Sequence, residues 1–147
     1  MIIKTVSSIF ATLGFCILFN IKGKNLLYAS LGGGLGWFVY MLGLNMHFSV
    51  TASMFLASIV IGIYSEVMAR VHKAPVTIFV VCALIPLVPG GGMYYTMLES
   101  ITGSINTSLH LGLETLTNAG ALAIGIVLTS SLSKFVSYRR RPNNKVF

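Results

Sequence analysis

Two prolines and three consecutive glycines interrupt an uncharged apolar stretch at residues 76–98. The prolines remove two backbone donors and the glycines weaken helical preference, so a regular helix is not expected to persist across residues 86–92. Inside a membrane, opened backbone is tolerated only where it is buried in protein or lines a wet cavity. We therefore predict a broken helix whose second half starts near Met93 and directs its free N–H groups at an anionic solute. A simple proline kink or a tight surface loop is the alternative. The candidate substrate-binding residues are Pro86, Pro89, Gly90, Gly91, Gly92 and Tyr94.

Five ionisable residues lie at or near the ends of apolar stretches, where a charge is costly and often functional. Glu66 and Arg70 are four residues apart, so on a helix they share a face and can pair. His110 and Glu114 have the same spacing and could relay a proton, because histidine titrates near neutral pH. We interpret these four residues and Glu99 as candidates for gating or ion coupling. The alternatives are a surface ion pair for the first two and a solvated helical turn for the others.

The motifs of zinc proteases, serine hydrolases and nucleotide-binding proteins are absent. The sequence contains no His-Glu-x-x-His, no Gly-x-Ser-x-Gly and no Gly-x-x-x-x-Gly-Lys. Cys16 and Cys82 are isolated in apolar runs and match no metal spacing or disulfide framework, so we interpret them as small buried hydrophobic residues. We predict no catalytic residue, no metal site and no cofactor, and do not expect an enzyme. Transport would then draw on an ion gradient, a substrate gradient or a partner.

The composition is typical of a membrane protein. Hydrophobic residues make up 55% and charged residues 9% of the 147 residues, and the mean hydropathy is +0.86. Soluble domains do not carry so apolar a composition. The formal charge of +7 comes from basic clusters between apolar runs, without the interleaved aromatic residues that nucleic-acid binding requires. We therefore expect a lipid bilayer around this protein and no nucleic-acid partner.

Five apolar stretches approach the roughly 20 residues that a helix needs to cross a bilayer. We predict an all-α fold, a polytopic transmembrane bundle of about five spans in one domain with a broken fourth helix. A basic cytoplasmic tail is expected at residues 137–147. The predicted spans are residues 3–21, 26–45, 49–68, 76–98 with the break at 86–92, and 108–136.

Lysine and arginine alternate between the connections of these spans. They occur at Lys22 and Lys24, at Arg70 and Lys73, and again in the tail, whereas residues 45–49 and 100–108 contain none. Because basic residues accumulate on the cytoplasmic side, the pattern predicts an N-terminus outside and a C-terminus in the cytoplasm. An odd number of spans also gives two homologous halves opposite orientations, as in the inverted repeats of secondary transporters.

Small residues recur at helical spacing within three of the spans. This spacing lets helix backbones approach closely, and we interpret it as packing, with a substrate path as the alternative. The spaced residues are Gly32 and Gly36 in the second span, Ser53 and Ala57 on one stripe with Ile61 in the third, and Ala121 and Gly125 in the last.

Specific segments follow one another along the chain: residues 34–42 with their glycines and tryptophan, residues 65–70 (SEVMAR), Pro75, and residues 85–91 (IPLVPGG). Together they resemble the C-terminal membrane half of the threonine/serine exporter family. The resemblance covers nearly the whole chain, and its most specific part is the PLVPG core.

The resemblance implies a small subunit of a two-component exporter in the bacterial cytoplasmic membrane, acting with a larger membrane subunit of the same family. Some split pairs of the family are associated with succinate export, so the cargo is expected to be threonine, serine or a dicarboxylate such as succinate. Two other functions fit the sequence. One is a non-transporting membrane scaffold or assembly subunit, and the other is a homo-oligomeric carrier that needs no partner.

Overall fold

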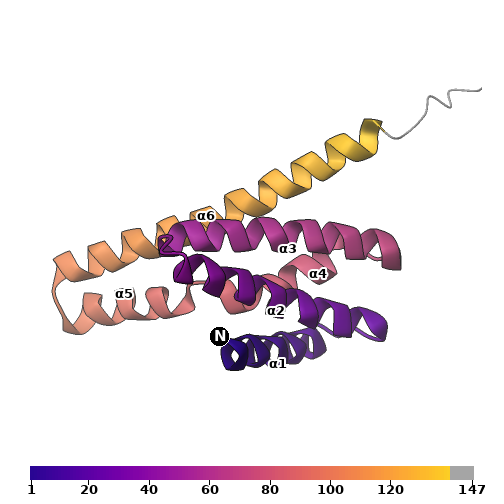
Figure 1. Ribbon diagram of the computed structural model, residues 1–147. Helices are drawn as coiled ribbons and strands as arrows, with labels where there is room; N and C mark the ends of the chain where they lie inside the picture. The colour runs from indigo at the N-terminus through magenta and orange to yellow at the C-terminus, as the bar shows by residue number, and fades with distance from the viewer. Residues whose placement is uncertain (140–147) are drawn as a thin grey trace, which may run out of the picture.

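The computed structural model describes residues 1–139, which form six α-helices and one short 3-10 helix and contain no strand (Figure 1). The predicted all-α fold is confirmed. The tail predicted at residues 137–147 lies outside the described residues from residue 140 onward. The elements are α1 (Ile2–Leu18), α2 (Lys24–Asn45), α3 (Val50–His72), α4 (Val76–Leu84), the 3-10 helix η1 (Ile85–Leu87), α5 (Gly90–Thr102) and α6 (Ile105–Arg139).

Three of the described helices, α2, α3 and α6, are long and apolar enough to cross a bilayer. The segment formed by α4 and η1 combines with α5 into a fourth, broken unit that is bent by 49°. The remaining helix, α1, is apolar but has only 17 residues, about 25 Å at 1.5 Å per residue. These five units agree with the predicted bundle of about five spans.

Local sequence signals set the two ends of α3. The Oγ atom of Ser49 accepts a hydrogen bond from the Ala52 N–H at 3.2 Å and caps the first turn. At the other end, Lys73 adopts the left-handed conformation with a φ of 50° that often closes a helix. Pro75 then prevents the helix from continuing and begins α4, which returns beside α2 and α3.

Glycines of α2 allow the neighbouring helices to approach its backbone. Gly36 lies against Ile61 of α3 and Leu87 of η1, and Gly32 lies against Tyr64 of α3. A Cβ at Gly36 would collide with Ile61, and one at Gly32 would come too close to the Tyr64 ring. The predicted small-residue face of the second span therefore serves in helix packing.

Residues of α3 contact residues of α6 that are 67 positions later in the chain, at both ends of the interface, so the two helices run parallel. The Thr51 hydroxyl donates to Oδ1 of Asn118 at 2.7 Å near the start of α3, and the Ser133 hydroxyl donates to Glu66 at 2.6 Å near its end. Between these two hydrogen bonds, one glycine of each helix lies against a hydroxyl side chain of the other helix at the same offset. These two pairs are Ser58 with Gly125 and Gly62 with Thr129.

The register leaves the first part of α6 without a neighbour from α3. Because Asn118 is level with Thr51, residues 105–117 of α6 extend past the start of α3, by about 20 Å at 1.5 Å per residue. In this region α5 packs against α6, and the two form a hairpin that projects from the end of the bundle (Figure 1). We call α5 and residues 105–117 the projecting hairpin.

Replacing Thr51 by valine should lower the free energy of unfolding by about 1 kcal/mol, because buried Asn118 would lose the donor to its Oδ1 atom. Unfolding in mixed micelles of increasing dodecyl sulfate content measures this loss. Thr117 to valine is the matched control, since the Thr117 hydroxyl is exposed and bonds only to the Glu114 carbonyl of its own helix. Equal losses in the two variants would contradict the interhelical role of Thr51.

Candidate functional site

The break in the fourth unit consists of Val88 and Pro89, between η1 and α5. Leu87, which precedes it, packs against Gly36 in the middle of α2, so the break lies within the length of the bundle. The Val88 N–H still bonds to the carbonyls of Leu84 and Ile85, at 3.2 Å each. The predicted broken helix is thus confirmed, but the non-helical segment is limited to Val88 and Pro89 and does not extend over residues 86–92.

The second half of the broken helix begins at Gly90, not near Met93 as expected. Pro89 ends the preceding helix because its ring leaves no donor, and the chain can then restart at once. A helical glycine costs about 1 kcal/mol relative to alanine. This cost is offset where the Met93 N–H bonds to the Pro89 carbonyl at 3.2 Å and where Gly92 packs on Thr115 of α6.

The first turn of α5 offers backbone donors. Its N–H groups have no acceptor within the helix, as in every helical first turn. Within residues 1–139, the N–H groups of Gly91 and Gly92 bond to no other atom of the chain, whereas the Gly90 N–H bonds to the Val88 carbonyl at 2.7 Å. Gly90 and Gly91 are exposed, and a Cβ on either would meet nothing within 4 Å. This turn is open to a solute or to another protein.

The six candidate binding residues do not converge on one cavity. Pro86 lines a cavity of about 310 Å³ between α1, α2 and η1, together with Lys4, Ser8 and Trp37. The Trp37 Nε1 atom is buried and has no hydrogen-bond partner among the described residues. Tyr94 lines neither the cavity with Pro86 nor the one with Pro89, and it is exposed, with its ring 5.3 Å from that of Tyr95.

Pro89 lines a groove of about 400 Å³ between α5 and α6, which we call the break groove. Two threonines contribute hydroxyls to it, but each hydroxyl donates to a carbonyl of its own helix. Thr96 bonds to the Gly92 carbonyl at 2.8 Å and Thr115 to the Leu111 carbonyl at 2.7 Å. The groove therefore presents mainly apolar side chains, such as Val88, Met93, Met97 and Leu116.

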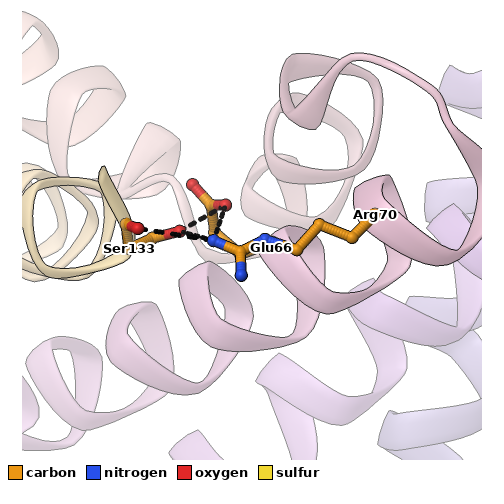
Figure 2. A network of polar contacts seen from close by, with 3 residues as sticks. All are labelled: Glu66, Arg70 and Ser133. Atoms are coloured by element: carbon orange, nitrogen blue, oxygen red, sulfur yellow. Dashed lines mark hydrogen bonds and ion pairs between the residues drawn. The ribbon is translucent and has the colours of Figure 1, made fainter. Parts of the chain in front are cut away.

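Glu66 and Arg70 are brought together as their spacing predicts, and Figure 2 shows Ser133 of α6 joining them. The Glu66 Oε2 and Arg70 guanidinium nitrogen are 3.8 Å apart. The Ser133 hydroxyl lies between them, accepting from Arg70 at 2.6 Å and donating to Glu66 at 2.6 Å. Sequence reasoning missed Ser133, although Thr129 and Ser133 continue the predicted stripe of Ala121 and Gly125 in the last span at four-residue spacing.

The other ionisable candidates lie on the projecting hairpin, away from this network. Glu99 is half-buried, and its carboxylate folds back over Gly103. His110 and Glu114 are exposed on α6, and in the described part of the chain no hydrogen bond or ion pair links the two side chains. The proton relay through them stays a prediction.

Comparison with known proteins identifies the family. The chain matches the family described as Threonine/Serine exporter, ThrE, over residues 4–132, which include the break, Glu66 and Arg70 but not Ser133, and all of α1 to α5 except the first residues of α1. No solved structure matches the chain. The matched region covers most of the 147 residues, and the chain therefore belongs to the threonine/serine exporter family of membrane transporters.

Proposed function

We propose that this chain is one subunit of a secondary exporter that moves a small polar metabolite, threonine, serine or a dicarboxylate such as succinate, together with a larger membrane subunit. The observation that carries the proposal is the open first turn of α5. Two backbone N–H groups, on Gly91 and Gly92, have no acceptor among the described residues and lie next to a proline break within the length of the bundle. Free N–H groups at a helix N-terminus attract the carboxylate that all of these solutes carry.

The distribution of polar and apolar side chains on the projecting hairpin supports a protein partner. Its two helices meet through small and polar groups: the Ser100 and Ser108 hydroxyls are 2.6 Å apart, and Ser108 donates to the Thr96 carbonyl at 2.9 Å. Large apolar side chains are exposed on both helices beside the exposed His110 and Glu114, which is unlike a hairpin that stands in water. The exposed side chains are Tyr94, Met97 and Ile101 on α5 and Ile105, Leu109, Leu113 and Leu116 on α6.

The position of the hairpin points to a membrane protein as that partner. Residues 105–117 reach past the start of α3, so the bundle itself does not cover them. Exposed Gly90 and Gly91 at the base of α5 allow a second backbone to approach closely. A partner with apolar helices covers both features and closes the break groove into a chamber for the cargo.

We also infer the orientation from the basic residues. Lys22 precedes α2 and Lys24 is its first residue, whereas Arg70 lies in the last turn of α3 and Lys73 follows it, so both clusters belong to one end of the bundle. Placing that end in the cytoplasm follows the usual distribution of basic residues in a bacterial cytoplasmic membrane. The projecting hairpin then lies toward the outer side.

Efflux from cells loaded with threonine, serine or succinate tests the proposal. We expect export of at least one of these solutes when the chain and its larger partner are produced together, and none when either is produced alone. Export by the chain alone would identify a homo-oligomeric carrier instead. No export by the pair, with both proteins present in the membrane, would favour a non-transporting scaffold.

A further inference from the structure

A second groove, of about 360 Å³, runs between α3 and α6. Glu66, Arg70 and Ser133 lie at its polar part, and Ile59, Ile63 and Leu132 are among the apolar residues of its walls. We call it the α3–α6 groove. It is separate from the break groove, with which it shares no residue. Its size is at the lower end of the range for small-molecule sites.

The two charges in this groove do not satisfy each other. Their nearest atoms are 3.8 Å apart, which is too long for a hydrogen bond. Ser133 separates them and uses one Arg70 nitrogen and one Glu66 oxygen. A guanidinium has five N–H donors, and a carboxylate has a second oxygen. Both groups therefore keep hydrogen-bonding capacity for a ligand (Figure 2).

The exposure of the two side chains fits an entry site. Glu66 is 19% exposed and Arg70 is 49% exposed, so neither charge is sealed inside the protein. A ligand with one positive and one negative group can replace the Ser133 bridge by direct, charge-assisted hydrogen bonds. A dianion would bring negative charge against Glu66, and a simple cation would leave Arg70 without a partner.

We propose that the α3–α6 groove binds a zwitterion, with its ammonium group on Glu66 and its anionic group on Arg70. This inference rests on the proposed export function only for the identity of the ligand. If the chain exports amino acids, the groove selects serine or threonine at the end of the bundle that carries Arg70 and Lys73. The phosphoethanolamine headgroup of a membrane lipid carries the same two charges, and the experiment separates these sources.

Binding of labelled serine to the full chain alone, in nanodiscs of phosphatidylglycerol, tests the site, because Glu66, Arg70 and Ser133 all belong to this chain. Serine should bind about tenfold or more tightly than ethanolamine, which lacks the carboxylate, and than 3-hydroxypropanoate, which lacks the ammonium group. Glu66→Gln and Arg70→Gln should each weaken serine binding by a similar factor. Lys22→Gln, which removes an exposed charge outside the groove, is the control and should bind serine as the unchanged chain does.

Thermal unfolding of the same samples checks that the variants are folded, and only a small loss is expected because Glu66 is partly exposed and Arg70 is half-exposed. The lipid source is tested in nanodiscs that contain phosphatidylethanolamine. If the headgroup fills the groove, serine does not bind, and the phosphatidylethanolamine retained through purification falls in Glu66→Gln but not in Lys22→Gln. That result supports the zwitterion site and removes the cargo assignment.

Serine binding and lipid retention that are both unchanged by Glu66→Gln would overturn the proposal, as would equal binding of serine and ethanolamine. These readouts need neither the partner nor transport. Failure of efflux would therefore count against the proposed export function, and failure of binding against the groove.

Discussion

Replacing Gly90 and Gly91 together by alanine should lower efflux by about tenfold or more while the chain becomes more stable. Alanine stabilises a helix by up to about 1 kcal/mol per replaced glycine, and a Cβ at either position meets no atom of this chain within 4 Å. The loss of efflux is expected because the added methyl groups keep the cargo, or the backbone of the partner, away from the free N–H groups of α5. Efflux from loaded cells and unfolding of the purified chain measure the two effects.

Gly14 to alanine is the control for this pair of substitutions. Gly14 is also exposed in a helix and has nothing within 4 Å of its Cβ position, but it lies on α1, away from the break. It should raise stability and leave efflux unchanged. Co-purification of the partner with the Gly90 and Gly91 variant separates two causes: a retained partner indicates a blocked cargo, and a lost partner indicates a blocked interface. Normal efflux in this variant would refute the role of the open turn.

Replacing Gly125 by alanine should destabilise the bundle by about 1–3 kcal/mol, the usual cost of overpacking. Its Cβ would collide with the Ser58 hydroxyl and lie 3.1 Å from the backbone carbonyl oxygen of Phe55. Because that carbonyl belongs to the backbone of α3, α3 and α6 must move apart. Unfolding in mixed micelles should show an earlier transition.

Gly120 to alanine gives a matched comparison on the same helix. Nothing lies within 4 Å of the Cβ position at Gly120, so this variant should be as stable as the unchanged chain or slightly more stable. The Gly125 variant should also disturb the contact of Ser133 with Glu66 and Arg70, two turns further along the interface. Equal stability of the two variants would show that the close packing of α3 on α6 is not required.

Local chemistry explains what sequence reasoning found in the candidate site. Pro86 and Pro89 lie close together in an apolar run, and proline breaks a helix wherever it occurs in the interior. Glu66 and Arg70 pair because a helix places residues four apart on one face. The start of α5 was misplaced because glycine has a poor intrinsic preference for helix, whereas Gly92 is held there by its contact with Thr115 of α6. That contact joins residues far apart in the chain.

The sequence by itself determined that this is an all-helical membrane protein, where its fourth helix breaks, and that Glu66 can reach Arg70. Each of these follows from composition or from spacing within one turn. Only the tertiary structure decided that Ser133 bridges the pair, that Pro86 and Pro89 line different cavities, and that the first part of α6 projects past α3. The reason is that these features depend on how one helix slides and rotates against another. That register, in which residues of α3 lie beside the residues of α6 that are 67 positions later, is set by the summed packing of small residues along the interface.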